Sequence, residues 1–292
     1  MRAIILTSPG KPEAVVIPDP EPGEGQVRIK MAGAAVNPAD LHVIDSGETG
    51  LGLGLDVAGV VDQVGPGVHS LAVGTPVAAL QFPHATHATA GAAAEYVIVP
   101  AADTAAVPEG IDLLDAATVP LNSLTAVQLL GLLGPSAGRR LLVTGAAGGV
   151  GGYAVALAAR HGWSVTGLAR ATDTEFLTRA GADQVVTNLE EVTNVDAVLD
   201  TALLNEPALN AVRDHGVYVG IFPGKEPPSE RGIDITSAVV VPDGAALEQM
   251  LALTAQGVLE SRRAGTIPLR NATAAYAKFR AGGFRGRWVI TP

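Results

Sequence analysis

The feature of the sequence that most constrains the fold is a glycine-rich turn between two regular segments, in the stretch RRLLVTGAAGGVGGYAVALAARHG at residues 139–162. Leu141–Thr144 predicts a buried parallel strand, and the alanine-rich run that begins near Gly149 predicts an amphipathic helix. Gly148 and Gly151 fall in the turn, where a Cβ would block a phosphate or hold the helix away from the strand. The first amides of that helix would face the phosphates, and the positive end of its dipole favours an anion. The stretch therefore predicts a site for the diphosphate of a dinucleotide.

The turn has the pattern A-x-G-x-x-G, because alanine replaces the first glycine of the dinucleotide fingerprint. A second apolar run, Ser164–Ala169, follows at the distance that a βαβ unit requires. A purely structural glycine turn remains an alternative. So does a membrane span over Leu141–Ala159, which has 19 residues without a charge, although the glycine cluster and Thr144 argue against it. The candidate cofactor-binding residues of the turn are Ala146, Gly148, Gly149, Val150 and Gly151.

Composition limits the class of protein. The 292 residues have room for two domains, and 48% hydrophobic with 16% charged residues fits compact α/β layers. The net charge of −10 is spread without a basic stripe, which argues against a nucleic-acid partner. The absence of cysteine excludes disulfides, thiolate nucleophiles and thiolate zinc sites. The first ten residues predict a strand rather than a signal peptide, so we expect a cytoplasmic protein without a membrane partner.

The pattern along the chain predicts a doubly wound, six-stranded parallel Rossmann sheet over 116–257 and a β-rich catalytic domain over 1–115 and 258–292. The tail would return to complete the first domain, and the nicotinamide end of the cofactor would lie in a cleft between the two. The expected Rossmann strands are 141–144, 164–169, 184–187, 196–201, 217–222 and 234–241, and the expected helices are 149–161, 173–180, 206–214 and 243–256.

Several motifs add a resemblance to a known family. They are NPADLHVIDSG at 37–47, LDVAGVVDQVGPGV at 55–68, GAAAEYVIVP at 91–100, VPLNSLTAVQLL at 119–130 and the terminal GRWVITP. With the glycine turn, they make nearly the whole chain resemble the medium-chain dehydrogenase/reductase superfamily. The chain is most similar to its zinc-free quinone oxidoreductase branch, and it also resembles the enoyl reductase domains of polyketide synthases. The resemblance implies that the first domain is GroES-like.

Zinc-dependent members of that superfamily carry Gly-His-Glu where this chain has Gly54-Leu55-Asp56, and they use cysteine ligands. The resemblance therefore implies that no catalytic zinc is bound. Of the six histidines, only His84 and His87 are closely spaced, and they lie in an Ala/Thr-rich loop without an evident third ligand. We interpret them as loop histidines, with a metal-binding pair as the alternative.

The second Rossmann strand ends in TGLARATDTE, with Arg170 where an NAD-specific protein has an acidic residue. A guanidinium binds a 2′-phosphate in a bidentate fashion, so the sequence favours NADPH over NADH. The alternative is a solvated arginine, and Asp173 could be either a helix cap or a competing acid.

By resemblance, Asn37 would lie beside the nicotinamide ribose, Thr125 would contact the nicotinamide region, and Gly220, Ile221 and Phe222 would line the same pocket. The structural alternatives are that Asn37 is an ordinary turn residue before a proline and that Thr125 sits inside a helix. Hydride transfer requires an acceptor carbon held against the nicotinamide in a dry site, and it requires no protein nucleophile.

A proton must also reach the reduced substrate. Relatives often have tyrosines just after the Asn-x-x-Asp segment, whereas this chain has His42 there. His42 is the preferred acid, with a buried histidine bonded to backbone as the alternative. Lys225 lies near where enoyl reductases place a lysine, and solvent is a third source of the proton.

Together these features predict an NADPH-dependent, zinc-free oxidoreductase whose substrate is a flat quinone or α,β-unsaturated carbonyl compound. One alternative is an enoyl reductase of a polyketide or other biosynthetic pathway. Another is a nucleotide-binding protein without turnover. The apolar strand ITSAVVV at 235–241 would form a sheet edge that needs cover, which suggests a homodimer.

Overall fold

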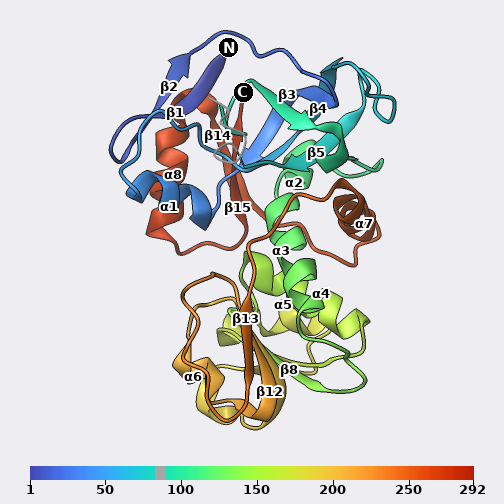
Figure 1. The fold of residues 1–292 in the computed structure, drawn as a ribbon, viewed down its shortest axis with the longest axis vertical. Coiled ribbons are helices and arrows are strands. Elements are labelled where there is room, and N and C mark those ends of the chain that lie inside the picture. The colour runs from blue at the N-terminus through green and yellow to red at the C-terminus, as the bar shows by residue number, and fades with distance from the viewer. Residues whose placement is uncertain (83–89) are drawn as a thin grey trace. The chain divides into compact units, whose positions relative to one another are not determined.

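The computed structural model describes residues 1–82 and 90–292, so His84 and His87 lie outside the described residues. The chain folds as two units, which are coloured along the chain in Figure 1. The first unit comprises Met1–Leu121, Pro242–Gln256 and Ser261–Pro292, and the second comprises Asn122–Val241 and Gly257–Glu260.

The first unit is built on a mixed, mostly antiparallel sheet whose strand order is β14-β15-β3-β4-β5-β7, with β6 paired to β3. Val27, Ile29 and Met31 alternate with more exposed residues on β3 and enter the core, as the period of a half-buried strand requires. The last strand, β15, pairs antiparallel with β3, so the C-terminal segment belongs to the sheet of this unit. The strands are β1 (Arg2–Ser8), β2 (Lys11–Val16), β3 (Gln26–Ala35), β4 (Asp56–Val64), β5 (Pro76–Leu80), β6 (Tyr96–Pro100), β7 (Thr104–Ala106), β14 (Arg263–Pro268) and β15 (Arg287–Thr291).

Helix α8 lies against β14 and β15 at one edge of this sheet (Figure 1), α7 contacts β7 at the other edge, and α2 packs against β3, β4 and β5. Helix α7, which the sequence pattern places in the Rossmann region, is part of the first unit instead. Gly244 at its start approaches the chain before β7 so closely that a Cβ would lie 2.3 Å from the carbonyl oxygen of Ala102. The helices are α1 (Pro38–Asp45), η1 (Ala101–Asp103), α2 (Leu113–Ala116), α7 (Gly244–Ala255), η4 (Leu269–Asn271) and α8 (Ala272–Ala281).

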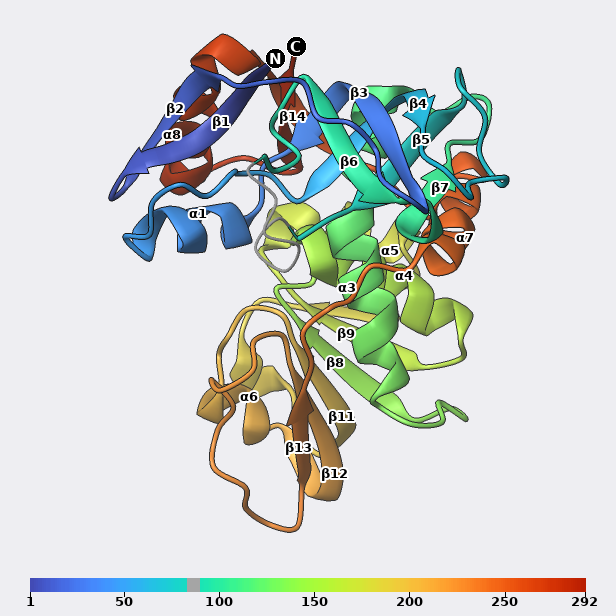
Figure 2. The same cartoon turned by 45° about the horizontal axis from the view of Figure 1, so that its top comes forward.

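The second unit contains the predicted six-stranded parallel sheet, in the order β10-β9-β8-β11-β12-β13. The order reverses between β8 and β11, so the carboxyl ends of these strands form the switch point of a doubly wound fold. Figure 2 shows α3 and α4 on one side of this sheet and α6 on the other. The strands are β8 (Arg140–Thr144), β9 (Ser164–Leu168), β10 (Gln184–Val186), β11 (Val195–Asp200), β12 (Val212–Gly220) and β13 (Asp234–Ser237). The helices are α3 (Pro120–Gly131), which begins at the end of the first unit, α4 (Gly149–Arg160), η2 (Ala171–Asp173), α5 (Thr174–Arg179), η3 (Leu189–Glu191) and α6 (Glu206–Leu209).

Three predicted elements differ from the structure. The helix expected over 206–214 ends at Leu209, because Val212 already pairs with Val195 as the start of a bulged β12. The strand expected over 234–241 ends at Ser237. The strand expected over 217–222 starts earlier, at Val212, and ends at Gly220.

The uncharged stretch 141–159 does not form one long helix. It divides into β8, the glycine turn and α4. In the part of the chain that the structure describes, no helix combines the length and apolarity needed to cross a bilayer.

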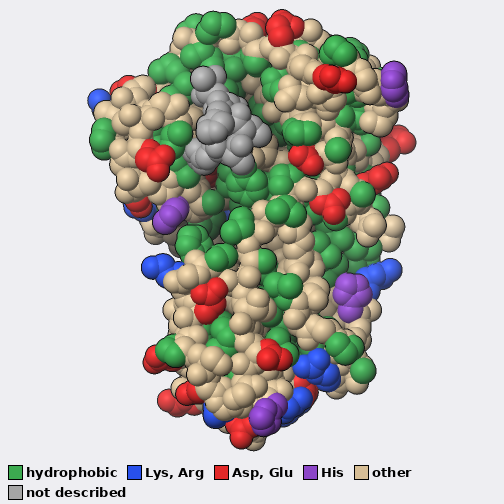
Figure 3. All heavy atoms as spheres, viewed as in Figure 1, with side chains coloured by type: hydrophobic (Ala, Val, Ile, Leu, Met, Phe, Trp, Pro, Cys, Tyr) green, Lys and Arg blue, Asp and Glu red, His purple; other side chains and the backbone are tan. Residues whose placement is uncertain are grey.

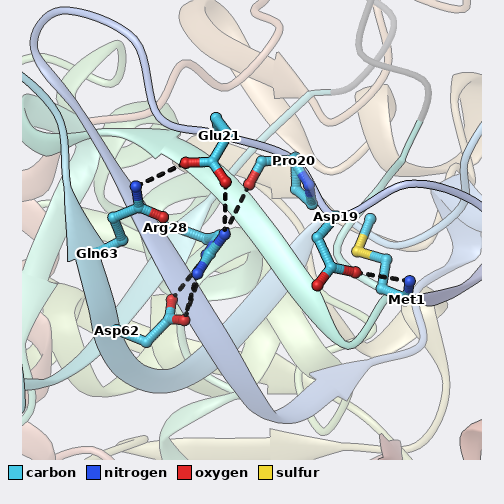
Figure 4. Close-up of polar contacts among 7 residues, drawn as sticks. All are labelled: Met1, Asp19, Pro20, Glu21, Arg28, Asp62 and Gln63. Atoms are coloured by element: carbon cyan, nitrogen blue, oxygen red, sulfur yellow. Dashed lines mark hydrogen bonds and ion pairs between the residues drawn. The ribbon is translucent and has the colours of Figure 1, made fainter.

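Arg28 on β3 is the centre of a polar cluster that joins three segments of the first unit (Figure 4). Its guanidinium donates to both carboxylate oxygens of Asp62 on β4, at 2.9–3.2 Å, and to the carbonyl oxygen of Pro20 at 3.0 Å. Its carbon Cζ also lies 4.9 Å from the ring centroid of Tyr96 on β6. The cluster therefore fixes the segment before β3 against the sheet. On the face drawn in Figure 3, basic and acidic side chains are interspersed.

Candidate functional site

The glycine turn between β8 and α4 has the geometry of a phosphate-binding loop. Gly145 adopts a left-handed conformation with φ +56°, and its carbonyl accepts a hydrogen bond of 2.7 Å from the amide of Gly148. Gly151 is buried where a Cβ would lie 2.3 Å from the same carbonyl oxygen, so only glycine allows α4 to approach β8 this closely. Ala146 is fully buried, and its amide donates to the carbonyl of Leu168 on β9. Ala146 thus packs the turn against the sheet.

The exposed side of the turn fits an anion. Gly148 and Gly149 are exposed and carry no side chain that could block a phosphate. The amides of Gly149, Val150 and Gly151 belong to the first turn of α4, where an α-helix supplies no internal acceptor. Their dipoles add to the positive end of the helix. The residues present therefore suit the diphosphate of a dinucleotide.

Arg170 and Asp173 follow β9 and differ in accessibility. Arg170 is exposed, and its guanidinium has no hydrogen-bond or ion-pair partner among the described residues. Asp173 is only 6% exposed and interacts with the protein around it. Of the two competing groups, the guanidinium is therefore the one that a nucleotide in solution can reach.

The other predicted cofactor residues of the second unit lie on α3 and β12. Thr125 is buried within α3. Gly220 ends β12 and pairs with Asp200 on β11, so it stands at the carboxyl edge of the sheet. Beyond the strand, Ile221 is half-buried. Phe222 and Lys225 are exposed in the turn that follows.

The sequence analysis missed a buried carboxylate at this edge. Asp200 has no exposed surface, and its oxygens accept hydrogen bonds from the hydroxyls of Thr144, at 2.5 Å, and Tyr218, at 2.7 Å. It also accepts from the backbone amide of Asn205 at 2.8 Å. Burial, with the neighbouring Asp200 as the second cause, raises the pKa of the Tyr218 hydroxyl, which keeps it protonated as a donor. An aspartate that ends an apolar strand was the only sequence signal for this group.

In the first unit, Asn37 is fully buried at the start of α1. Its side-chain nitrogen donates to the carbonyl of Ala35 at 3.1 Å and to Asp56 at 2.8 Å. Its backbone amide donates to Asp40 at 2.7 Å. Asn37 is thus held in one orientation by two carboxylates, which is more than an ordinary turn residue before a proline requires.

Asp40 and Asp56 are themselves buried, and the sequence analysis assigned neither of them a role. Asp40 accepts from the amide of Gly54 at 2.9 Å, and Asp56 accepts from the amide of Leu121 at 2.6 Å. Burial raises the pKa of Asp40 to about 6 and that of Asp56 to about 7, while these hydrogen bonds and the charge of Arg287 act in the opposite direction. The acid of Asn-x-x-Asp and the acid after Gly-Leu were visible in the sequence, but their burial was not.

His42 lies on α1 and is exposed, so the alternative of a buried histidine bonded to backbone is wrong. It belongs to the first unit, whereas Lys225 belongs to the second. Within the described residues, no group of three His, Asp or Glu side chains is arranged to hold a metal ion. Asp56, at the position where zinc-dependent relatives have glutamate, is already engaged by Asn37 and Leu121.

The two buried carboxyls predict a dependence of stability on pH. Between about pH 4 and 7, the folded protein holds protons on Asp40 and Asp56 that the unfolded chain has released, so their contribution to the free energy of unfolding falls as pH rises. Asp56→Asn removes one of these groups. We expect the stability of this variant relative to wild type to rise across that range by on the order of 1 kcal/mol or more, measured by urea denaturation at each pH.

Asp45→Asn is the matched control, because Arg280 lowers the pKa of the exposed Asp45. Its stability relative to wild type is expected to show no such rise. If the free energies of unfolding of wild type and Asp56→Asn change in parallel with pH, the raised pKa of Asp56 is contradicted.

Known proteins match both units. The alcohol dehydrogenase GroES-like domain family matches residues 23–109, and the zinc-binding dehydrogenase family matches residues 174–290. The chloroplast envelope quinone oxidoreductase homolog of Arabidopsis thaliana is 28% identical over 96% of this chain and 94% of its own length. The chloroplastic NADPH-dependent alkenal/one oxidoreductase of the same plant is 30% identical over 94% of this chain and 74% of its own length.

A solved structure, the quinone oxidoreductase from Coxiella burnetii, shares the fold with a TM-score of 0.87 at 24% identity, covering 100% of this chain and 99% of that one. The matches agree with the GroES-like first unit and the Rossmann-type second unit. The chain therefore belongs to the medium-chain dehydrogenase/reductase superfamily and is an oxidoreductase.

Proposed function

We propose that the protein reduces a flat quinone or an α,β-unsaturated carbonyl compound with NADPH and without a metal ion. The observation that carries the proposal is the glycine turn at the switch point of the sheet, which places the first turn of α4 behind the exposed Gly148 and Gly149. The names of the two plant relatives support the same substrate classes. The absence of cysteine and the engagement of Asp56 with Asn37 and Leu121 support chemistry without zinc.

The nicotinamide supplies a hydride when it is bound. The protein has to bind the nucleotide, orient the substrate against it and provide a proton to the reduced substrate. The amides of Gly149, Val150 and Gly151 would hold the diphosphate, and Gly148 would leave room for it because it carries no side chain. Asn37, which is fully buried and fixed by Asp56 and Asp40, would lie behind the surface that faces the nicotinamide ribose, and Thr125 and Gly220–Phe222 would line the nicotinamide region. We keep the exposed His42 as the preferred proton donor, followed by Lys225 and solvent.

The reaction is tested by mixing the purified protein with NADPH and following absorbance at the nicotinamide band while acceptors are varied. We expect oxidation that depends on a simple quinone or an alkenal. Consumption only with enoyl thioesters would support the alternative of a biosynthetic enoyl reductase. Tight NADPH binding without oxidation by any acceptor would contradict the proposal and favour a binding protein without turnover.

The preference for NADPH is proposed to rest on the exposed guanidinium of Arg170, which has no partner among residues 1–82 and 90–292. Replacing Arg170 with alanine removes a charge-assisted contact to the 2′-phosphate, so we expect the dissociation constant of NADPH to rise about tenfold or more. The dissociation constant of NADH should change little, because NADH has no 2′-phosphate. Isothermal titration calorimetry measures both.

Arg160→Ala is the control for Arg170→Ala, because Arg160 is also exposed and lies at the far end of α4. Equal losses of NADPH and NADH affinity in Arg170→Ala, or the same loss in Arg160→Ala, would remove Arg170 from the site.

We also propose a homodimer through the edge of the second unit's sheet. β13 is the last strand of that sheet, and Val239 and Val241 beyond it are 67% and 59% exposed. An open edge with apolar side chains needs cover. Sedimentation equilibrium at micromolar concentration should give twice the 29.5 kDa chain mass, and a monomer mass would refute the dimer. The cytoplasmic location expected from the sequence stays a prediction.

A further inference from the structure

Asp200 joins the carboxyl ends of three neighbouring strands to one loop. Its hydroxyl partners come from β8 (Thr144) and β12 (Tyr218), and Asp200 itself ends β11. Its remaining acceptor capacity is used by the loop 201–205, through the amides of Ala202 at 3.3 Å and Asn205 at 2.8 Å. A single buried carboxylate therefore sets where this loop lies.

The loop in turn touches the glycine turn. The hydroxyl of Thr201 donates to the carbonyl of Thr144 at 2.6 Å, and the amide of Ala202 donates to the Thr144 hydroxyl at 3.1 Å. A Cβ on Gly145 would lie 3.1 Å from the Thr201 hydroxyl and 3.2 Å from the Ala202 Cβ. The loop therefore packs against Gly145. The carbonyl of Gly145 in turn accepts the hydrogen bond from the Gly148 amide.

The loop has a backbone that needs outside support. Leu203 and Asn205 adopt positive φ angles of 56° and 59°, which non-glycine residues rarely occupy. Such conformations persist only where surrounding contacts hold them, and they gather at functional sites. Here the hydrogen bond from the Asn205 amide to Asp200 supplies such a contact.

We propose that Asp200 is a positioning residue for the nucleotide site. Through Thr144 and the loop 201–205, it holds Gly145 in the left-handed conformation whose carbonyl fixes Gly148, so that the amides of Gly149, Val150 and Gly151 face a diphosphate. Asp200 has no exposed surface, so it acts without touching the ligand. This inference rests on the proposed function, because it assumes that the turn binds the diphosphate of NADPH.

The same strand offers a matched control. Asp196, near the amino end of β11, accepts from the amide of Arg140 at 2.8 Å and from the guanidinium of Arg213 at 2.7 Å. Like Asp200, it is a strand aspartate that binds backbone and side-chain donors. It lies at the edge of the sheet opposite to the glycine turn, so a loss of stability alone would appear in both variants.

The test compares Asp200→Asn with Asp196→Asn by calorimetric titration with NADPH, at a temperature where circular dichroism shows both variants folded. We expect the dissociation constant to rise about tenfold in Asp200→Asn and less than twofold in Asp196→Asn. Thr144→Val, which removes the hydroxyl that Asp200 and Ala202 share, should weaken binding as well. Thr144→Ser, which keeps the hydroxyl, should restore it.

A second readout needs no nucleotide. The Gly148 amide should exchange its hydrogen with solvent faster in Asp200→Asn than in wild type or Asp196→Asn, because its bond to Gly145 is loosened. Unchanged exchange in Asp200→Asn would overturn the inference, whether or not NADPH binds. If wild type binds no NADPH while the exchange effect is present, the proposed function fails and the coupling of Asp200 to the turn stands. Equal losses of NADPH affinity in Asp200→Asn and Asp196→Asn would also overturn the inference that Asp200 positions the glycine turn.

Discussion

The close approach of Gly151 to the carbonyl of Gly145 is the constraint on which the second unit depends. A Cβ at position 151 would lie 2.3 Å from that oxygen, so helix α4 could not start where it does with any other residue. This start leaves the amides of the first helical turn at the carboxyl end of β8, beside the reversal of strand order. A parallel sheet with its switch point there and a helix dipole aimed at the same place suit an anion without any charged side chain, as the proposed function requires.

Each unit adds buried carboxylates to its backbone framework. In the first unit, Asp40 and Asp56 fix the start of α1 and the amide of Asn37. In the second, Asp200 fixes a loop beside the glycine turn. Burying a carboxylate costs free energy unless its oxygens accept hydrogen bonds, and each of these three accepts at least two. The free-energy cost of burying Asp40, Asp56 and Asp200 suggests that these side chains orient a site and do more than stabilise the fold.

The sequence predicted the parts of the protein whose causes are local. The glycine turn, the six parallel strands and the returning tail follow from periodicity, glycine spacing and the lengths of the connections. The prediction of a helix over 206–214 was wrong because Val212 pairs with Val195 on β11. This pairing joins residues far apart in the sequence, so the local pattern does not indicate it. The carboxylate networks were missed for the same reason. Asp56 forms hydrogen bonds with Asn37 and Leu121, which are 19 and 65 residues away in the sequence. Asp200 forms one with Thr144, which is 56 residues away. The accessibility of Arg170 and the burial of Asp173 also required the folded chain.

Binding of the nucleotide at the glycine turn can be measured by titrating ¹⁵N-labelled protein with NADPH and following the backbone amides by nuclear magnetic resonance. We expect the amide signals of Gly148, Gly149, Val150 and Gly151 to shift together and to saturate with the nucleotide. Saturating NADPH that leaves these four signals in place, while signals elsewhere move or none move, would contradict binding at the glycine turn.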